Sequence, residues 1–213
     1  MGEVLAVFWG RVGLSMASGL GHLGFRCTGC GNCCRELRVP LTSADLRRLT
    51  AGSGLPAECL VDWLDPEAVN MTGEPESFVR LSERGRVLMA LAQREGACRL
   101  LDEANRCTAY MARPANCRLF PFAPEFGRRG GLRRLRLLGG TQCDSGTGEK
   151  HDPHALRVAD RLRWDEHRAY LVEVEAWNRS QRHRERLRHP LLGAGEFLHF
   201  LGVAQAREPH ALT

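Results

Sequence analysis

Four cysteines within eight residues carry the strongest chemical signal in the sequence: Cys27, Cys30, Cys33 and Cys34. Cysteines two residues apart on a tight turn can direct their sulfur atoms to one point, and Gly29 and Gly31 can supply the positive φ angles that such turns need. Two consecutive C-x2-C steps are typical of ferredoxin-type runs, in which three sulfurs hold one cubane and a fourth comes from elsewhere. The run therefore predicts a metal centre shared by Cys27, Cys30 and Cys33.

Cys33 and Cys34 pose a geometric question, because they are neighbours in the chain. In an extended backbone, successive side chains point to opposite sides. The two sulfurs would then not serve one metal equally. Either one of them faces a second centre, or one is a spare thiol beside the first.

A second set of cysteines is spread over the middle of the chain: Cys98, Cys107, Cys117 and Cys143. Their spacing alone is a weak signal, since a zinc ribbon would show another C-x2-C pair. Their number is informative, because the two sets together could complete two four-thiolate sites. We expect the second set to fold back beside the first, as one pooled site or two neighbouring ones. The ninth cysteine, Cys59, lies among Leu55, Leu60 and Trp63 and is expected in the core.

The chemical role of nine cysteines in 213 residues depends on the cellular compartment of the protein. No apolar run approaches the roughly 20 residues that span a bilayer, and the N-terminus lacks the basic start of a secretory signal. We therefore expect a cytoplasmic protein without a membrane segment. Thiols stay reduced there, so clustered cysteines favour metal binding or catalysis over disulfides.

The formal net charge of +5 does not by itself indicate a nucleic-acid partner. Lys150 is the single lysine and every other basic residue is arginine, a bias that GC-rich coding can produce. The charge count also treats every thiol as neutral. Two four-thiolate sites of charge −2 each would lower the net charge from +5 to +1. The expected partner is a metal ion or cluster, and neither nucleic acid nor a membrane is expected.

The elements that must position these thiols indicate a small, irregular α+β fold. Short apolar or alternating runs predict strands at Leu37–Leu41, Phe78–Leu81, Val87–Ala92, Ala97–Leu101 and Leu132–Leu138. The Val87–Ala92 strand is expected to pair with Ala97–Leu101 across the turn at 94–96. Helices are predicted from Thr42 or Ser43 to about Leu49, before a loop at 52–54, and from Pro56 through Cys59 and Trp63.

The character of the sequence changes after Gly148. Asp152 and Pro153 are an N-cap and a first-turn proline, and a helical period follows that continues into the charged stretch Arg179–Arg188. A last short helix is expected over Glu196–Leu201. We therefore divide the chain into a lead-in at 1–24, a metal-binding domain at 25–148 and a helical C-terminal region at 149–213 that packs on it.

Several blocks of the sequence resemble a known family. The run from Phe25 to Cys34 resembles the opening of the YkgJ family of cysteine-cluster proteins, the CxxCxxCC zinc- or iron-chelating domain. The resemblance covers about residues 25–145 and continues in Leu41-Thr42-x2-Asp45, in Cys98–Asp102 and Arg106–Tyr110, and in Arg113-Pro114-x2-Cys117 through Phe122. Cys143 stands where the family's trailing cysteine is expected, and Cys59 lies outside the pattern.

The resemblance implies a metal-chelating domain, and the family includes flagellin lysine N-methylases that carry an iron–sulfur cluster. We expect an iron–sulfur cluster of the 4Fe–4S type, with zinc as the alternative. Arg113 and Arg118 flank Cys117 and are candidates to support a thiolate-rich centre through their charge. Three functions stay open: a structural or electron-transfer metal module, a cluster-dependent redox or methyl-transfer enzyme, and a zinc or iron carrier.

Overall fold

The structure is a computed structural model that describes residues 24–25, 29–69, 75–129, 131–138, 145–150 and 152–204. Its mixture of helices and short antiparallel strands confirms the expected α+β class. The helices are α1 (Asn32–Glu36), α2 (Ser43–Ser53), α3 (Ala57–Leu60), α4 (Ala115–Leu119), α5 (Pro153–Arg186) and α6 (Ala194–Phe200). The strands are β1 (Gly24–Phe25), β2 (Val61–Leu64), β3 (Val79–Leu81), β4 (Gly85–Leu91), β5 (Gln93–Arg94), β6 (Ala97–Cys98), β7 (Phe122–Phe126), β8 (Leu132–Leu137) and β9 (Ser145–Lys150). Short 3-10 turns are η1 (Pro66–Ala68), η2 (Pro75–Ser77) and η3 (Tyr110–Ala112).

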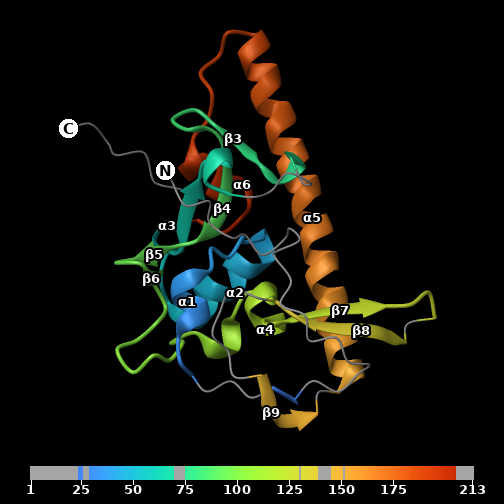
Figure 1. The fold of residues 1–213 in the computed structure, drawn as a ribbon. Coiled ribbons are helices and arrows are strands. Elements are labelled where there is room, and N and C mark those ends of the chain that lie inside the picture. Colours follow the sequence, from blue (N-terminus) through green and yellow to red (C-terminus); the bar gives the residue numbers. More distant parts are fainter. Residues whose placement is uncertain are drawn as a thin grey trace.

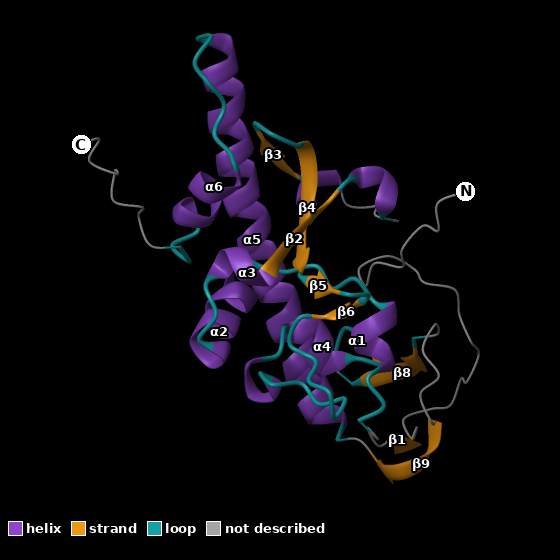
Figure 2. Cartoon of the chain, turned by 90° about the vertical axis from the view of Figure 1, so that its left-hand side faces the viewer, coloured by secondary structure: helices purple, strands orange, loops and turns teal. Residues whose placement is uncertain are grey.

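β4 is the central strand of the three-stranded sheet β2-β4-β3 (Figure 2). Both of its neighbours are antiparallel to it, with Trp63 of β2 opposite Met89. An extended segment before α2 also pairs with β4. Its Leu41 N–H donates to the Met89 carbonyl, and the Leu91 N–H donates to the Val39 carbonyl. The strand predicted at 37–41 is therefore present as isolated bridges to β4.

The helix predicted from Thr42 is confirmed in its start and is longer than expected. Thr42 and Asp45 form a capping box, the local arrangement that satisfies the free N–H groups of a helix start. The helix continues past Leu49 to Ser53, because Gly54 adopts a positive φ of 69° and its N–H closes the last turn on the Thr50 carbonyl. The loop expected at residues 52–54 is thus the end of α2 and its cap.

Two other predicted elements need correction. The helix that follows Pro56 ends at Leu60, and Trp63 lies in strand β2, since Val61 and Trp63 are residue types that favour a half-buried strand. The strand predicted at 97–101 is only two residues long. It pairs with β5, and β4 ends before it.

The long helix α5 runs along one side of the molecule (Figure 1). Its inner face buries Tyr170, Val174 and Trp177 in the main core, where the Trp177 ring lies 5.1 Å from the Phe197 ring of α6. Each such aromatic or aliphatic side chain stabilises the fold by about 1.5–3 kcal/mol through burial. The Asp152 cap and the extension of the helix through the charged stretch agree with the sequence-based prediction.

The segment between α5 and α6 is tied to the β3–β4 turn by polar contacts. Glu83 accepts hydrogen bonds from the Ser82 hydroxyl and, at 2.8 Å, from the Ala194 N–H at the start of α6. Burial acts to raise the pKa of Glu83, but these hydrogen bonds outweigh it and the pKa lies below its ordinary value. The charged carboxylate therefore helps to anchor α6.

We expect Glu83→Gln to weaken the fold at neutral pH by no more than about 1 kcal/mol, because Glu83 is exposed and its charge is screened. A lowered carboxyl pKa stabilises the folded state above the unfolded pKa, and this contribution is lost as the pH falls through the folded pKa. Urea unfolding of both proteins at pH 7 and at successively lower pH would measure the difference in unfolding free energy. A gap that stays constant with pH would contradict this role of Glu83.

The remaining strands form two small antiparallel pairs. β7 pairs with β8, which confirms the strand predicted at 132–138, and β1 pairs with β9 so that Phe25 lies opposite Ser145. Within the part of the chain that the structure describes, none of the helices combines the length and the apolar character that crossing a membrane requires.

Candidate metal centre

A cavity of about 400 Å³ lies at the end of the molecule that carries α1, α4 and the β5–β6 hairpin. Five cysteines line it: Cys33, Cys34, Cys98, Cys107 and Cys117. The rest of its wall is largely apolar and includes Leu37, Val39, Leu49, Leu91, Leu100 and Phe120. Cysteines separated by up to 84 positions in the sequence are thus brought to a single cavity.

Helix α1 presents the neighbouring cysteines Cys33 and Cys34. Gly31 caps it with a positive φ of 74°, and the Cys34 N–H donates to the Gly31 carbonyl. Because the backbone here is helical and not extended, the two side chains do not point to opposite sides. Their sulfurs lie 4.0 Å apart. The sequence-based argument for opposite directions therefore does not apply.

A compact loop presents Cys98 and Cys107. Cys98 ends strand β6, opposite Gln93, and Cys107 pairs with Leu101 through an isolated bridge. The Thr108 N–H donates to the Leu100 carbonyl and closes the loop. Two cysteines nine positions apart in the sequence are in this way held on one wall of the cavity.

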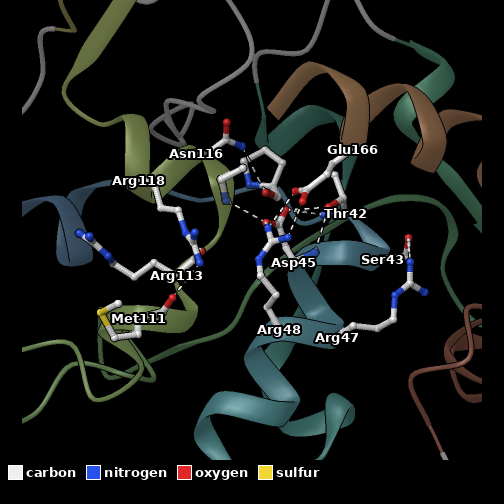
Figure 3. Close-up of polar contacts among 12 residues, drawn as sticks. Thr42, Ser43, Asp45, Arg47, Arg48, Met111, Arg113, Asn116, Arg118 and Glu166 are labelled. Atoms are coloured by element: carbon white, nitrogen blue, oxygen red, sulfur yellow. Dashed lines mark hydrogen bonds and ion pairs between the residues drawn. The ribbon is translucent and has the colours of Figure 1, made fainter. Parts of the chain in front are cut away.

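Helix α4 presents Cys117, and the buried carboxylate of Asp45 holds the start of this helix (Figure 3). One oxygen of Asp45 accepts from the Ala115 N–H at 2.8 Å, and the other accepts from the Thr42 N–H and hydroxyl. Arg48 donates to the Asp45 carboxylate at 2.6 Å and to Glu166 of α5. Asp45, which the sequence indicated only as part of a family block, thus connects α2 to the Cys117 helix.

Four of the cavity thiols, here called the inner thiols, influence one another's protonation: Cys33, Cys98, Cys107 and Cys117. The hydrogen bond with Cys34, followed by burial, raises the pKa of Cys33. Burial is the main cause at the other three and raises the pKa of Cys98 to about 11. In every pair of inner thiols, the charge of one thiolate also raises the pKa of the other thiol. All four are therefore close enough to interact electrostatically with one another. Metal binding would displace their protons.

The inner thiols surround the cavity more loosely than the ligands of a single ion. Across the described residues, no three cysteine, histidine, aspartate or glutamate side chains lie together at the spacing that one ion requires. The donor chemistry nevertheless suits a metal, since four thiolates are the ligand set of structural zinc and of cubane clusters.

The two arginines predicted to support the centre have different positions. Arg113 lines the cavity, stacks its guanidinium 3.5 Å from the centre of the Tyr110 ring and acts to lower the pKa of the Cys107 thiol. Arg118 does not line it. Its guanidinium donates to the carbonyls of Arg113 and Met111 and so braces the backbone of η3 (Figure 3).

Asn116, next to Cys117, is a cavity residue that the sequence did not indicate. Its side chain is 2 % exposed, and its Nδ2 lies 3.5 Å from the Pro40 carbonyl. Its Oδ1 is buried and has no hydrogen-bond partner among the described residues. Arg106, which the sequence indicated only as the first residue of a family block, also lines the cavity; its side chain is largely exposed and pairs with Asp102.

The other predicted cysteines do not all reach this cavity. Cys30 is exposed and is not among the residues that line it. Cys27 and Cys143 lie outside the described residues, so the centre predicted for Cys27, Cys30 and Cys33 stays a prediction. Cys59 is half-buried on α3 rather than fully buried in the core, and it does not line the cavity.

A family model described as "CxxCxxCC: Putative zinc- or iron-chelating domain" matches residues 26–143, which is more than half of the chain. The chain belongs to the CxxCxxCC family. The YkgJ name used above is consistent with this family. The family region contains all five cavity cysteines, together with Asp45 and Asn116. No curated protein and no solved structure matches the chain. The family description supports metal binding for this protein in general terms.

Proposed function

We propose that this CxxCxxCC protein holds an iron–sulfur cluster through its inner thiols. The proposal rests on one observation. A single cavity is lined by four thiols from separate positions in the chain, namely Cys33, Cys98, Cys107 and Cys117. Four soft thiolates match the ligand set of a 4Fe–4S cubane. Because the protein would supply all four ligands of the cluster as thiolates, the role proposed for the cluster is structural or in electron transfer.

The size of the cavity favours a cluster over one zinc ion. Thiolates on one tetrahedral zinc lie about 3.8 Å apart, whereas those around a cubane lie roughly 6–7 Å apart. A space of about 400 Å³ with inner thiols spread around it suits the larger group. Zinc remains the competing metal, because four thiolates also accept it readily.

The charges around the cavity support the same proposal. Four thiolates and an oxidised cubane carry a net charge of −2, which needs nearby positive groups in a largely apolar space. Arg106 and Arg113 line the cavity, and the charge of Arg38 acts to lower the pKa of Cys98. These guanidiniums would stabilise an anionic cluster and would tune its reduction potential. The need for reduced thiols agrees with the proposal of a cytoplasmic location.

Anaerobic isolation of the full chain tests the metal. We expect brown protein that contains iron and acid-labile sulfide in near-equal amounts and that bleaches with dithionite, because a reduced cubane absorbs less visible light. Iron, zinc and sulfide would be measured on the same preparation. Colourless anaerobic protein with one zinc per site and no sulfide would contradict the cluster and identify a zinc module.

A further inference from the structure

Helix α5 carries exposed apolar side chains on the face that is turned away from the core. Val158, Leu162 and Val172 are 54 %, 42 % and 70 % exposed. The opposite face of the helix buries residues such as Tyr170 and Val174. In Figure 1, α2, α4 and α6 all lie to the left of α5, on the side of this buried face. The outer face is therefore available for a contact with another molecule.

The exposed apolar residues belong to a regular stripe, here called the α5 stripe. Its positions are separated alternately by four and three residues, so they lie on one face along about 27 Å of helix. This spacing is the one by which two helices pack against each other in a coiled coil. All six residues of the stripe are exposed: Val158, Leu162, Asp165, Ala169, Val172 and Ala176.

We propose that the α5 stripe is the interface of a homodimer, in which the α5 helices of two copies pack antiparallel. A two-fold axis level with residue 167 places Leu162 opposite Val172 of the partner subunit. It also places Val158 opposite Ala176 of the partner subunit. Because the axis is two-fold, each of these apolar contacts occurs twice. The proposal does not depend on metal binding.

Asp165, in the middle of the stripe, favours the antiparallel orientation. In a parallel, in-register pair each residue of the stripe would face its own copy, so two Asp165 carboxylates would meet at the interface. In the antiparallel pair Asp165 faces Ala169 of the partner subunit. Arg168 already forms an ion pair with Asp165 within each chain. The two carboxylates and the two guanidiniums would then form a cluster without net charge beside the axis.

The charges that border the stripe are also complementary in this orientation. Arg161 and Glu175 lie on the same side of the stripe, and their side chains are 83 % and 57 % exposed. They are 14 positions apart, about 21 Å along the helix, so they do not pair within one chain. In the antiparallel dimer each Arg161 lies opposite Glu175 of the partner subunit. A parallel dimer would instead offer it Glu166, which is largely buried and paired with Arg48.

Sedimentation velocity of the full chain under reducing, anaerobic conditions tests the dimer. We expect a dimer whose fraction rises with protein concentration in the micromolar range. Leu162→Arg should raise the dimer dissociation constant at least about 100-fold, because the charge enters two apolar contacts. Val172→Arg should have the same effect and replaces Leu162→Arg if that variant does not fold. Met111→Arg is the matched control, since Met111 is 85 % exposed but lies on η3 and does not line the cavity.

A charge exchange tests the orientation. Arg161→Glu and Glu175→Arg should each weaken the dimer by about 10-fold, since each puts like charges opposite each other at two places. The double variant should regain most of the wild-type affinity. A wild-type chain that is monomeric at every concentration would overturn the proposal, as would wild-type dimerisation of both Leu162→Arg and Val172→Arg or a double variant no tighter than the single ones. Metal content of the same preparations reports separately on the proposed function.

Discussion

Replacing Asp45 with alanine is expected to lower the free energy of unfolding by about 2–6 kcal/mol, because two buried backbone N–H groups each lose their acceptor at about 1–3 kcal/mol. The carboxylate is 1 % exposed and accepts hydrogen bonds from Thr42, Ala115 and Arg48. Its removal leaves the two backbone N–H groups without an acceptor in the protein interior. Urea unfolding measures the loss as a lower midpoint at unchanged slope.

Asp165→Ala is the matched control for Asp45→Ala. Asp165 also pairs with arginines on its own helix, Arg161 and Arg168, but its side chain is 50 % exposed. Its removal should cost less than about 1 kcal/mol. Asp45→Asn, which keeps the shape but presents an amide N–H to backbone N–H donors, should bind less metal even where it folds, because α4 then no longer holds Cys117 in place. Equal effects at positions 45 and 165 would contradict this role.

Cys117→Ser is expected to cause the largest loss of bound metal among the single cysteine substitutions. Loss of a group that merely supports a ligand costs 10–100-fold in metal affinity, so loss of a thiolate ligand should cost more than about 100-fold. We choose Cys117 because Ala115 and Leu119 of the same helix are buried. This packing fixes the position of α4, so another thiol cannot easily take the place of Cys117. Iron, zinc and sulfide per chain would be measured after anaerobic isolation.

The control for Cys117→Ser is the same change at Cys59. Cys59 is half-buried on α3 and does not line the cavity, so its replacement should leave metal content unchanged. Unfolding curves of both variants would separate loss of metal from loss of fold. Equal loss of metal from the two proteins would show that the cavity is not the binding site.

Predictions that rested on residues close together in sequence agree best with the structure. The helix start predicted at Thr42 or Ser43 and the one at Asp152 and Pro153 each depend on contacts within three positions. Strand β3 and the long amphipathic helix α5 were likewise visible as patterns. Trp63 was misplaced because a large apolar residue after a short helix fits either a helical or a strand period, and pairing with β4 decides between them.

The arrangement of the site depends on contacts that no local pattern contains. The bond between Asp45 and the Ala115 N–H joins positions 70 apart, and it is what places the Cys117 helix. The side-by-side sulfurs of Cys33 and Cys34 follow from a helix of five residues, which is too short to show a period. Asn116 looks like an ordinary polar residue until the fold brings it to the cavity.

The main core has a consequence for the modularity of the protein. The family region ends at residue 143, yet Tyr170, Val174 and Trp177 of α5 and Phe197 of α6 fill the core against which the site is built. Excision at residue 143 would leave an open apolar face and would remove Glu166, the partner of Arg48. The proposed metal site therefore depends on helices outside the family region, and grafting it into another scaffold would require the C-terminal helices or a designed substitute for them.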